Sequence, residues 1–431
     1  MSPVIELGEM RHGESAGEPV AAPPRRPPGP TARVALLGCL VLLVVTAAAG
    51  PPRRPEPIRV PAPQGAAFVV LPDRVVVADG PGAIGRGGRV VAAYRLPGGE
   101  PAWRFVLTDG DHVLGLTAVA GGLLVTSSPA GDGDSVSAML DPATGMLRWR
   151  QPGYPVRTAS GGLLLENPRP PGAGTVRAVD PASGEVRWTL PVPGQEVGYR
   201  RDDDHGVTQL VLVTPQGRVT VYDADSGAVA HTGRVAPAAD RAAYRYAQVV
   251  ADLLLVEDAR GTVTGYGLDG LDERWSLPVG SRAGLWFADC AGMVCLRDQV
   301  GGAQALDPAT GRPAWTDERW LGMGPVGDRL IAAERGVGEE LELSALDPPT
   351  GRVLARLGRW RVSGNDLPSG PLLGLRTLTE DRTLVGALDV AAGQVRIRGI
   401  LPGAWSECAD TGTQLVCLRP TGGMAIWPAG R

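Results

Sequence analysis

Four cysteines stand in two pairs with the same local pattern, and their chemistry is the clearest in the chain. Cys290 lies five residues before Cys295, Cys408 lies nine before Cys417, and the second cysteine of each pair opens the tripeptide Cys-Leu-Arg. Facing Cβ atoms in adjacent antiparallel strands are about 4.5–5.5 Å apart, close to what a disulfide needs. We therefore predict local bridges Cys290–Cys295 and Cys408–Cys417. The alternatives are buried reduced thiols or metal ligation, and the second is disfavoured because no histidine lies near either pair.

Other side chains capable of chemistry are scattered. The four histidines, at 12, 112, 205 and 231, have no metal-ligand spacing. The run Asp202–His205 could bind a divalent cation, but a solvated acidic turn is the simpler interpretation. Residues 131–135 lack the later glutamate of a calcium loop, and the glycine-rich residues 82–88 lack a strand-and-helix context for phosphate. We predict no catalytic residue, no metal site and no cofactor.

A turn motif recurs about every forty residues, and the hairpins that it forms must position the side chains described above. It is Asp-Pro-Ala-Thr-Gly at residues 141–145 and 307–311, and Asp-Pro-Ala-Ser-Gly at 180–184. Aspartate accepts backbone N–H groups, proline presets φ, and glycine supplies the left-handed conformation that returns the chain into a hairpin. The predicted turn residues are Asp141 and Gly145, Asp180 and Gly184, Asp223 and Gly227, Asp307 and Gly311, Asp347 and Gly351, and Asp389 and Gly393.

A tryptophan follows the turn at a fixed distance. Trp149, Trp188 and Trp315 each stand eight residues after the turn aspartate. Trp275 fits the same position if Gly267 replaces the aspartate, and Trp103 ends a looser copy. Short apolar runs such as Leu163–Leu165 and Leu253–Val256 precede the turns, as expected for buried strands.

A forty-residue period with strand-like flanks is typical of an all-β propeller. The turns predict eight blades, within a range of seven to nine, because the last residues, 424–430, resemble half of a ninth unit. We expect ring closure to pair the last unit with an extended segment near residues 57–70.

The pattern Asp-x-x-Thr-Gly-x-x-x-Trp resembles the tryptophan-docking repeat of pyrroloquinoline quinone (PQQ)-like β-propellers, over roughly residues 66–431. The resemblance implies that Trp103, Trp149, Trp188, Trp275 and Trp315 pack between blades; a tryptophan cage for a ligand is the alternative. This family includes quinoprotein alcohol dehydrogenases, which use a calcium ion and a disulfide between adjacent cysteines, and non-catalytic relatives such as the propeller lipoprotein of the barrel-assembly machine. The chain has no Cys-Cys dipeptide, which favours the non-catalytic branch.

The region before the propeller differs in composition. Residues 1–33 are polar and proline-rich, which predicts a disordered cytoplasmic tail. Residues 34–50 carry no charge and predict a single transmembrane helix, and residues 51–65 form a proline-rich stem. Cleavage after the Ala47–Ala49 pattern, or lipidation at Cys39, are alternatives, and all three place the propeller outside the cytoplasm.

Charge and topology bound the function. A formal net charge of −4 argues against a nucleic-acid partner. Disulfides persist in oxidising compartments, in agreement with export. We therefore predict a single-pass, monomeric membrane protein, cytoplasmic at its N-terminus, whose propeller binds an envelope protein or a cell-wall component. The alternative is a PQQ-dependent dehydrogenase or another propeller enzyme acting on alcohols or carbohydrates.

Overall fold

The computed structural model describes most of the chain from residue 56 onward, and residues 56–431 form a unit separate from residues 1–55. The described ranges are 56–80, 89–108, 111–129, 134–167, 174–192, 197–202, 206–214, 216–235, 246–258, 260–278, 286–297, 302–363 and 372–428. The predicted tail, the anchor at 34–50, most of the stem and the segment 82–88 lie outside them. Within these ranges, no helix has the length and apolar character needed to cross a bilayer.

The described elements are strands, which we group in repeats of four. Repeats 1 to 3 comprise β2 (Ala67–Leu71), β3 (Arg74–Ala78), β4 (Val90–Arg95) and β5 (Pro101–Val106); β6 (His112–Val119), β7 (Gly122–Ser128), β8 (Val136–Leu140) and β9 (Leu147–Pro152); and β10 (Tyr154–Arg157), β11 (Leu163–Asn167), β12 (Gly174–Val179) and β13 (Val186–Val192). Repeats 4 to 6 comprise β14 (Val197–Arg201), β15 (Val207–Val213), β16 (Arg218–Asp223) and β17 (Val229–Arg234); β18 (Tyr246–Val250), β19 (Leu253–Glu257), β20 (Thr262–Gly267) and β21 (Glu273–Pro278); and β22 (Trp286–Cys290), β23 (Met293–Arg297), β24 (Ala303–Leu306) and β25 (Pro313–Asp317).

The remaining strands form three further repeats. Repeats 7 and 8 share β29 and comprise β26 (Gly322–Val326), β27 (Arg329–Glu334), β28 (Leu341–Leu346), β29 (Val353–Ser363), β30 (Leu372–Thr379), β31 (Arg382–Asp389) and β32 (Gln394–Pro402). Repeat 9 comprises β33 (Glu407–Asp410), β34 (Gln414–Leu418), β35 (Met424–Pro428) and, from the start of the unit, β1 (Ile58–Val60).

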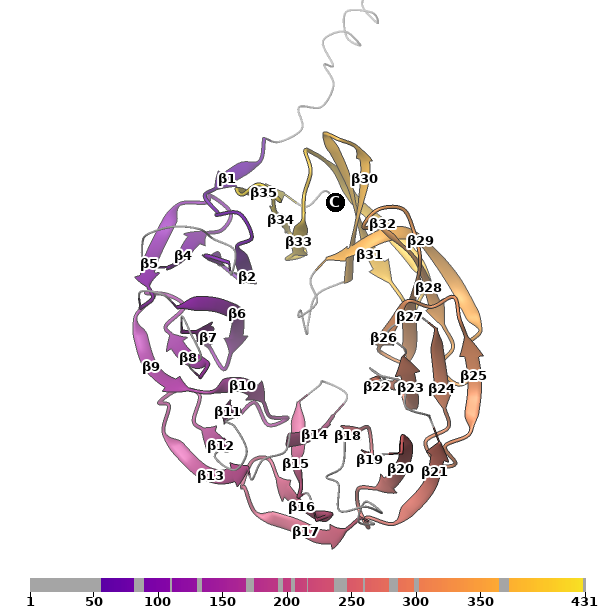
Figure 1. The fold of residues 1–431 in the computed structure, drawn as a ribbon. Coiled ribbons are helices and arrows are strands. Elements are labelled where there is room, and N and C mark those ends of the chain that lie inside the picture. The colour runs from indigo at the N-terminus through magenta and orange to yellow at the C-terminus, as the bar shows by residue number, and fades with distance from the viewer. Residues whose placement is uncertain are drawn as a thin grey trace, which may run out of the picture. The chain divides into compact units, whose positions relative to one another are not determined.

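These strands build antiparallel sheets that follow one another around a ring (Figure 1). The described strands form seven four-stranded sheets and one seven-stranded sheet, β26 to β32. The number of sheets is consistent with the predicted eight blades. The same strands make nine repeats, because the seven-stranded sheet contains repeats 7 and 8, which share β29. Residues up to Trp360 pair with β28, and residues from Arg361 pair with β30.

Strand β1 closes the ring. Ile58, Arg59 and Val60 pair with Ile426, Ala425 and Met424 of β35 (Figure 1). A closing segment near residues 57–70 was expected, but residues 58–60 were also assigned to the stem. These three residues pair with β35 and form the outer strand of repeat 9.

The core lies between neighbouring repeats. The apolar runs form the second strand of each repeat and are almost fully buried, as in Leu163, Leu164 and Leu165 at 2%, 0% and 0% exposure. One cluster joins Leu253 and Leu255 of β19 to Phe287 and Val294 of the next repeat. Alternate side chains of a strand point to opposite faces. The second strand of a repeat therefore packs against neighbouring repeats on both sides.

Candidate functional site

The repeated turns are held by their aspartates. The Oδ1 atom of Asp141 accepts hydrogen bonds from the backbone N–H groups of Ala143 at 2.9 Å and Thr144 at 3.0 Å, while Oδ2 pairs with Arg148 at 2.6 Å. Gly145 adopts a φ of 72° and donates its N–H to the Asp141 carbonyl. The Arg148 hydrogen bond, followed by hydrogen bonds from Thr144 and Ala143, lowers the pKa of Asp141 to about 2.

The second turn repeats this arrangement. Asp180 Oδ1 accepts from Ala182 and Ser183 at 3.0 Å each, and Oδ2 pairs with Arg187 at 2.5 Å. Here the backbone hydrogen bond from Ser183 is the largest cause that lowers the pKa of Asp180 to about 2, with Arg187 second. The turns are therefore rigid, charge-stabilised hairpin ends.

Each predicted tryptophan contacts the turn of the following repeat. The indole Nε1 donates to a turn carbonyl at 2.8–2.9 Å in all five: Trp103 to Pro142, Trp149 to Pro181, Trp188 to Asp225, Trp275 to Pro308 and Trp315 to Pro348. The ring covers the turn glycine so closely that a Cβ there would lie 2.5–2.7 Å from an indole carbon, at Gly145, Gly184, Gly227, Gly311 and Gly351 respectively. These five tryptophans thus lie between neighbouring repeats.

Three further residues occupy the same position without being tryptophan. His231, eight residues after Asp223, has its Nε2 2.6 Å from the carbonyl oxygen of Leu268. Ala355, eight after Asp347, lies against Gly393, and Ile58 of β1 lies against Gly99. The eight-residue spacing alone would have found His231 and Ala355. Ile58 has no upstream turn in the sequence and could not have been found in this way.

Both predicted disulfides are present. Cys290 is bonded to Cys295 with a Cα–Cα distance of 5.8 Å, and Cys408 to Cys417 with 4.1 Å. In each case the bridge joins the first strand of a repeat to the second. Cys408 and Cys417 are directly paired across the strands, whereas Cys290 pairs with Met293, so its bridge runs diagonally.

Two surface features could receive a partner. A shallow groove of about 340 Å³ lies between repeats 1 and 2, lined by the turns 71–74 and 118–122 and by Pro142 and Ala143. Arg74 crosses it and donates to the Pro142 carbonyl at 2.6 Å. The second feature is the loop 335–340. Most of the polar loops 130–135 and 168–174, and residues 203–205 of the loop 199–206, lie outside the described residues.

The loop 335–340 is fixed at its base and exposed at its tip. Glu339 pairs with Arg361 at 2.7 Å and Glu340 with Arg359 at 2.9 Å. Glu340 also accepts the backbone N–H of Thr377 at 2.6 Å. Val337 at the tip is 69% exposed, so an apolar side chain is presented to solvent on an ordered support.

The sequence matches a family model described as outer membrane protein assembly factor BamB over residues 86–317, more than half of the chain. The chain belongs to this family of PQQ-like propellers. Solved structures with similarity to this BamB-family chain include BamB from Moraxella catarrhalis (14% identity, 87% of this chain and 97% of that one, TM-score 0.42), the computationally designed Ika8 protein (12%, 87% and 100%, 0.44) and quinohemoprotein alcohol dehydrogenase from Comamonas testosteroni (13%, 85% and 74%, 0.41). No curated protein matches the sequence.

The described residues of this BamB-family propeller show no set of side chains that fits a bound quinone with calcium. The four cysteines of the ring are joined as two hairpin bridges, so none is left for a bridge between adjacent cysteines. In the described ranges, no three His, Cys, Asp or Glu side chains converge as metal ligands would. We therefore derive no chemistry through such a group.

Proposed function

We propose that this BamB-family chain is a non-catalytic, membrane-anchored propeller that presents a protein-binding surface in the cell envelope. Residues 34–50 would anchor it, with the N-terminus cytoplasmic and the ring outside. The two disulfides support this location, since such bonds persist in oxidising compartments. The family match supports an envelope protein as the partner.

The observation that carries the proposal is the contrast between fixed strands and presented loops. The indole contacts hold neighbouring repeats together, and the Arg359 and Arg361 ion pairs hold the loop 335–340. Loops on a rigid scaffold are where binding residues concentrate, and the exposed Val337 is an apolar contact of the kind found at the centre of interfaces.

Site-specific crosslinking tests the proposal. A photo-crosslinking residue at position 337 of the membrane-anchored protein is expected to trap one envelope protein. The control is position 146, because Met146 is equally exposed at 69% but lies beside the outer strand β9. A Val337→Asp variant should lose the adduct formed from a neighbouring position, and Met146→Asp should keep it. Equal crosslinking from both positions, or none from 337, contradicts the proposal.

Two further measurements separate the alternatives. Protease added to intact cells should degrade residues 56–431 and spare the tail, and full protection of the ring would exclude the proposed topology. Titration of the purified protein with PQQ and calcium, followed by dye-linked oxidation of alcohols and sugars, should show no turnover. Turnover would replace the binding function with a quinoprotein one.

A further inference from the structure

Repeat 9 is the smallest repeat and is built from both ends of the unit. Its strands have four, five, five and three residues. Strand β1 makes three residue pairs with β35, whereas the outer strand of repeat 8, β32, makes eight with β31. Regions with few contacts open locally at the lowest cost, so repeat 9 is where the ring is expected to open first.

The contact between repeats 8 and 9 has no docked tryptophan. The docking position in repeat 8, eight residues after Asp389, is Ile397, which is 54% exposed. Repeat 9 has no hairpin between its third and fourth strands, because β35 and β1 come from opposite ends of the unit. It therefore has no turn glycine to receive an indole.

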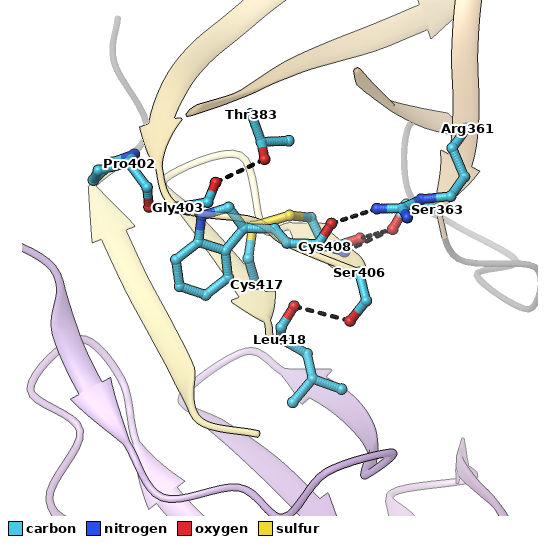
Figure 2. The surroundings of a disulfide bond; sticks show 10 residues. Arg361, Ser363, Thr383, Pro402, Gly403, Ser406, Cys408, Cys417 and Leu418 are labelled. Atoms are coloured by element: carbon cyan, nitrogen blue, oxygen red, sulfur yellow. Dashed lines mark hydrogen bonds between the residues drawn. A yellow bond between two sulfur atoms is a disulfide. The ribbon is translucent and has the colours of Figure 1, made fainter. Parts of the chain in front are cut away.

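Polar contacts to β33 take the place of docking (Figure 2). Ser363 of β29 donates its hydroxyl to the Cys408 carbonyl at 3.0 Å and accepts the Cys408 N–H at 2.6 Å. Arg361 donates to the carbonyl of Trp405, just before β33. Arg398 of β32 pairs with Asp410 at 2.6 Å, and both side chains are largely buried. These links from repeat 8 end on β33 or beside it.

Strand β33 thus carries these polar links to repeat 8, beside an apolar cluster that also reaches β34 and β35, and the disulfide ties β33 to β34. Cys408 on β33 is bonded to Cys417 on β34, next to a four-residue ladder (Figure 2). The two cysteines are 1% and 0% exposed. They lie in one apolar cluster with Leu373 and Leu375 of repeat 8 and with Trp427.

The other disulfide has the same place in its repeat but a different setting. Cys290–Cys295 also joins first and second strands, in repeat 6. That repeat receives Trp275 on its turn at Gly311 and sends Trp315 to Gly351 of the next. Repeat 6 is thus docked on both sides without its disulfide, whereas repeat 9 is not.

We propose that the Cys408–Cys417 disulfide is a redox-controlled latch: its reduction lets β33 leave β34 and opens the ring at repeat 9, whereas reduction of Cys290–Cys295 leaves the ring closed. The reductant is a dithiol. One thiolate attacks a sulfur of the bridge, which breaks the Cys408–Cys417 bond, forms a mixed disulfide and releases the other cysteine as a thiolate. The second thiolate then attacks the mixed disulfide and releases the cysteine that is still bound. The dithiol becomes a disulfide, and Cys408 and Cys417 become thiols. Local opening of the small repeat exposes the buried sulfurs to attack.

Dithiol titration of the full-length protein tests the order of events. Alkylation of new thiols, followed by peptide mapping, reports each bridge separately. Cys408–Cys417 is expected to be reduced about ten times faster than Cys290–Cys295, because repeat 9 opens more readily than repeat 6. Equal rates, or earlier reduction of Cys290–Cys295, overturn the proposal.

Trypsin reports the opening of the ring. The chain has no lysine, so cleavage occurs after arginine alone. Reduction should accelerate cleavage after Arg59 of β1 and Arg398 of β32 about tenfold, while the site in repeat 6 after Arg297 stays protected. Reoxidation should restore protection. Unchanged cleavage after Arg59 and Arg398 once Cys408–Cys417 is fully reduced also overturns the proposal.

Paired variants supply the matched control. Cys408→Ala with Cys417→Ala should show the fast cleavage pattern without dithiol, and Cys290→Ala with Cys295→Ala should show the wild-type pattern. The reverse assignment overturns the proposal. If the first variant does not fold, the wild-type titration alone decides, since it begins from the folded, oxidised protein.

Discussion

The Nε2 atom of His231 lies 2.6 Å from the carbonyl oxygen of Leu268. This ring occupies the place that a docked indole takes in repeats that carry the tryptophan. The partner turn has changed with it. Leu271 stands where the glycine is expected and keeps a φ of 54°, and its side chain is 7% exposed. A smaller ring and a larger turn residue thus fill the space that Trp and Gly fill elsewhere, as close packing of an interior requires.

This exchange predicts a compensated pair of substitutions. His231→Trp alone overpacks the contact against Leu271 and should cost about 1–3 kcal/mol of unfolding free energy. His231→Trp combined with Leu271→Gly should recover most of that loss. Urea unfolding of residues 56–431 measures both, and a single variant as stable as the double variant would mean that the two positions are not coupled.

The ordinary docking contact predicts a second coupled pair. Trp149→Ala removes a largely buried indole and should cost about 3–5 kcal/mol. Gly184→Ala should also destabilise, because its φ is 76° and the new Cβ would lie 2.6 Å from Trp149 Cγ. With both changes the steric part of the glycine effect disappears, so the double-mutant cycle should show a coupling of about 0.5–3 kcal/mol. Additive effects would contradict the docking geometry.

The sequence predicted contacts that depend on local spacing and missed those that depend on the ring as a whole. The docked tryptophans stand at a fixed spacing from the turns, and each disulfide closes a short hairpin. Residues close together in the sequence were therefore enough to predict these contacts. The contact of Ile58 with Gly99 exists because β1, from the start of the unit, is the outer strand of repeat 9. The contact of Ser363 with Cys408 exists because β29 runs on into the next repeat. Neither contact has a local signal.

The turn carboxylates predict an acid-sensitive stability. Folding lowers the pKa of Asp141 and Asp180 from 3.8 to about 2. The charged carboxylates therefore contribute stability above the unfolded pKa, and this contribution is lost as the pH falls through the folded value. Thermal unfolding of residues 56–431 should show a melting temperature that falls between about pH 4 and pH 2.

The control for this pH dependence replaces carboxylates with amides. Asp141→Asn combined with Asp180→Asn should flatten the decline in that interval. Asp328→Asn should leave it unchanged, because that carboxylate is 77% exposed and its ion pair with Arg329 is 3.8 Å long. An equally steep decline in the double variant would place the acid sensitivity elsewhere.

Ring closure by β1 predicts the effect of a short truncation. A chain that begins at Pro61 lacks the three pairs with β35 and leaves Met424 and Ile426, now 2% and 1% exposed, without their outer neighbour. It also removes Val60 from the cluster that joins repeats 9 and 1, and burial of a valine side chain is worth about 1.5–3 kcal/mol. Calorimetry should show a lower melting temperature than for a chain that begins at Glu56. A Val60→Ala variant, which keeps the backbone pairs, should fall between the two. If the truncated chain melts like the longer one, β1 does not close the ring, and the ends of the propeller are held by contacts between repeats alone.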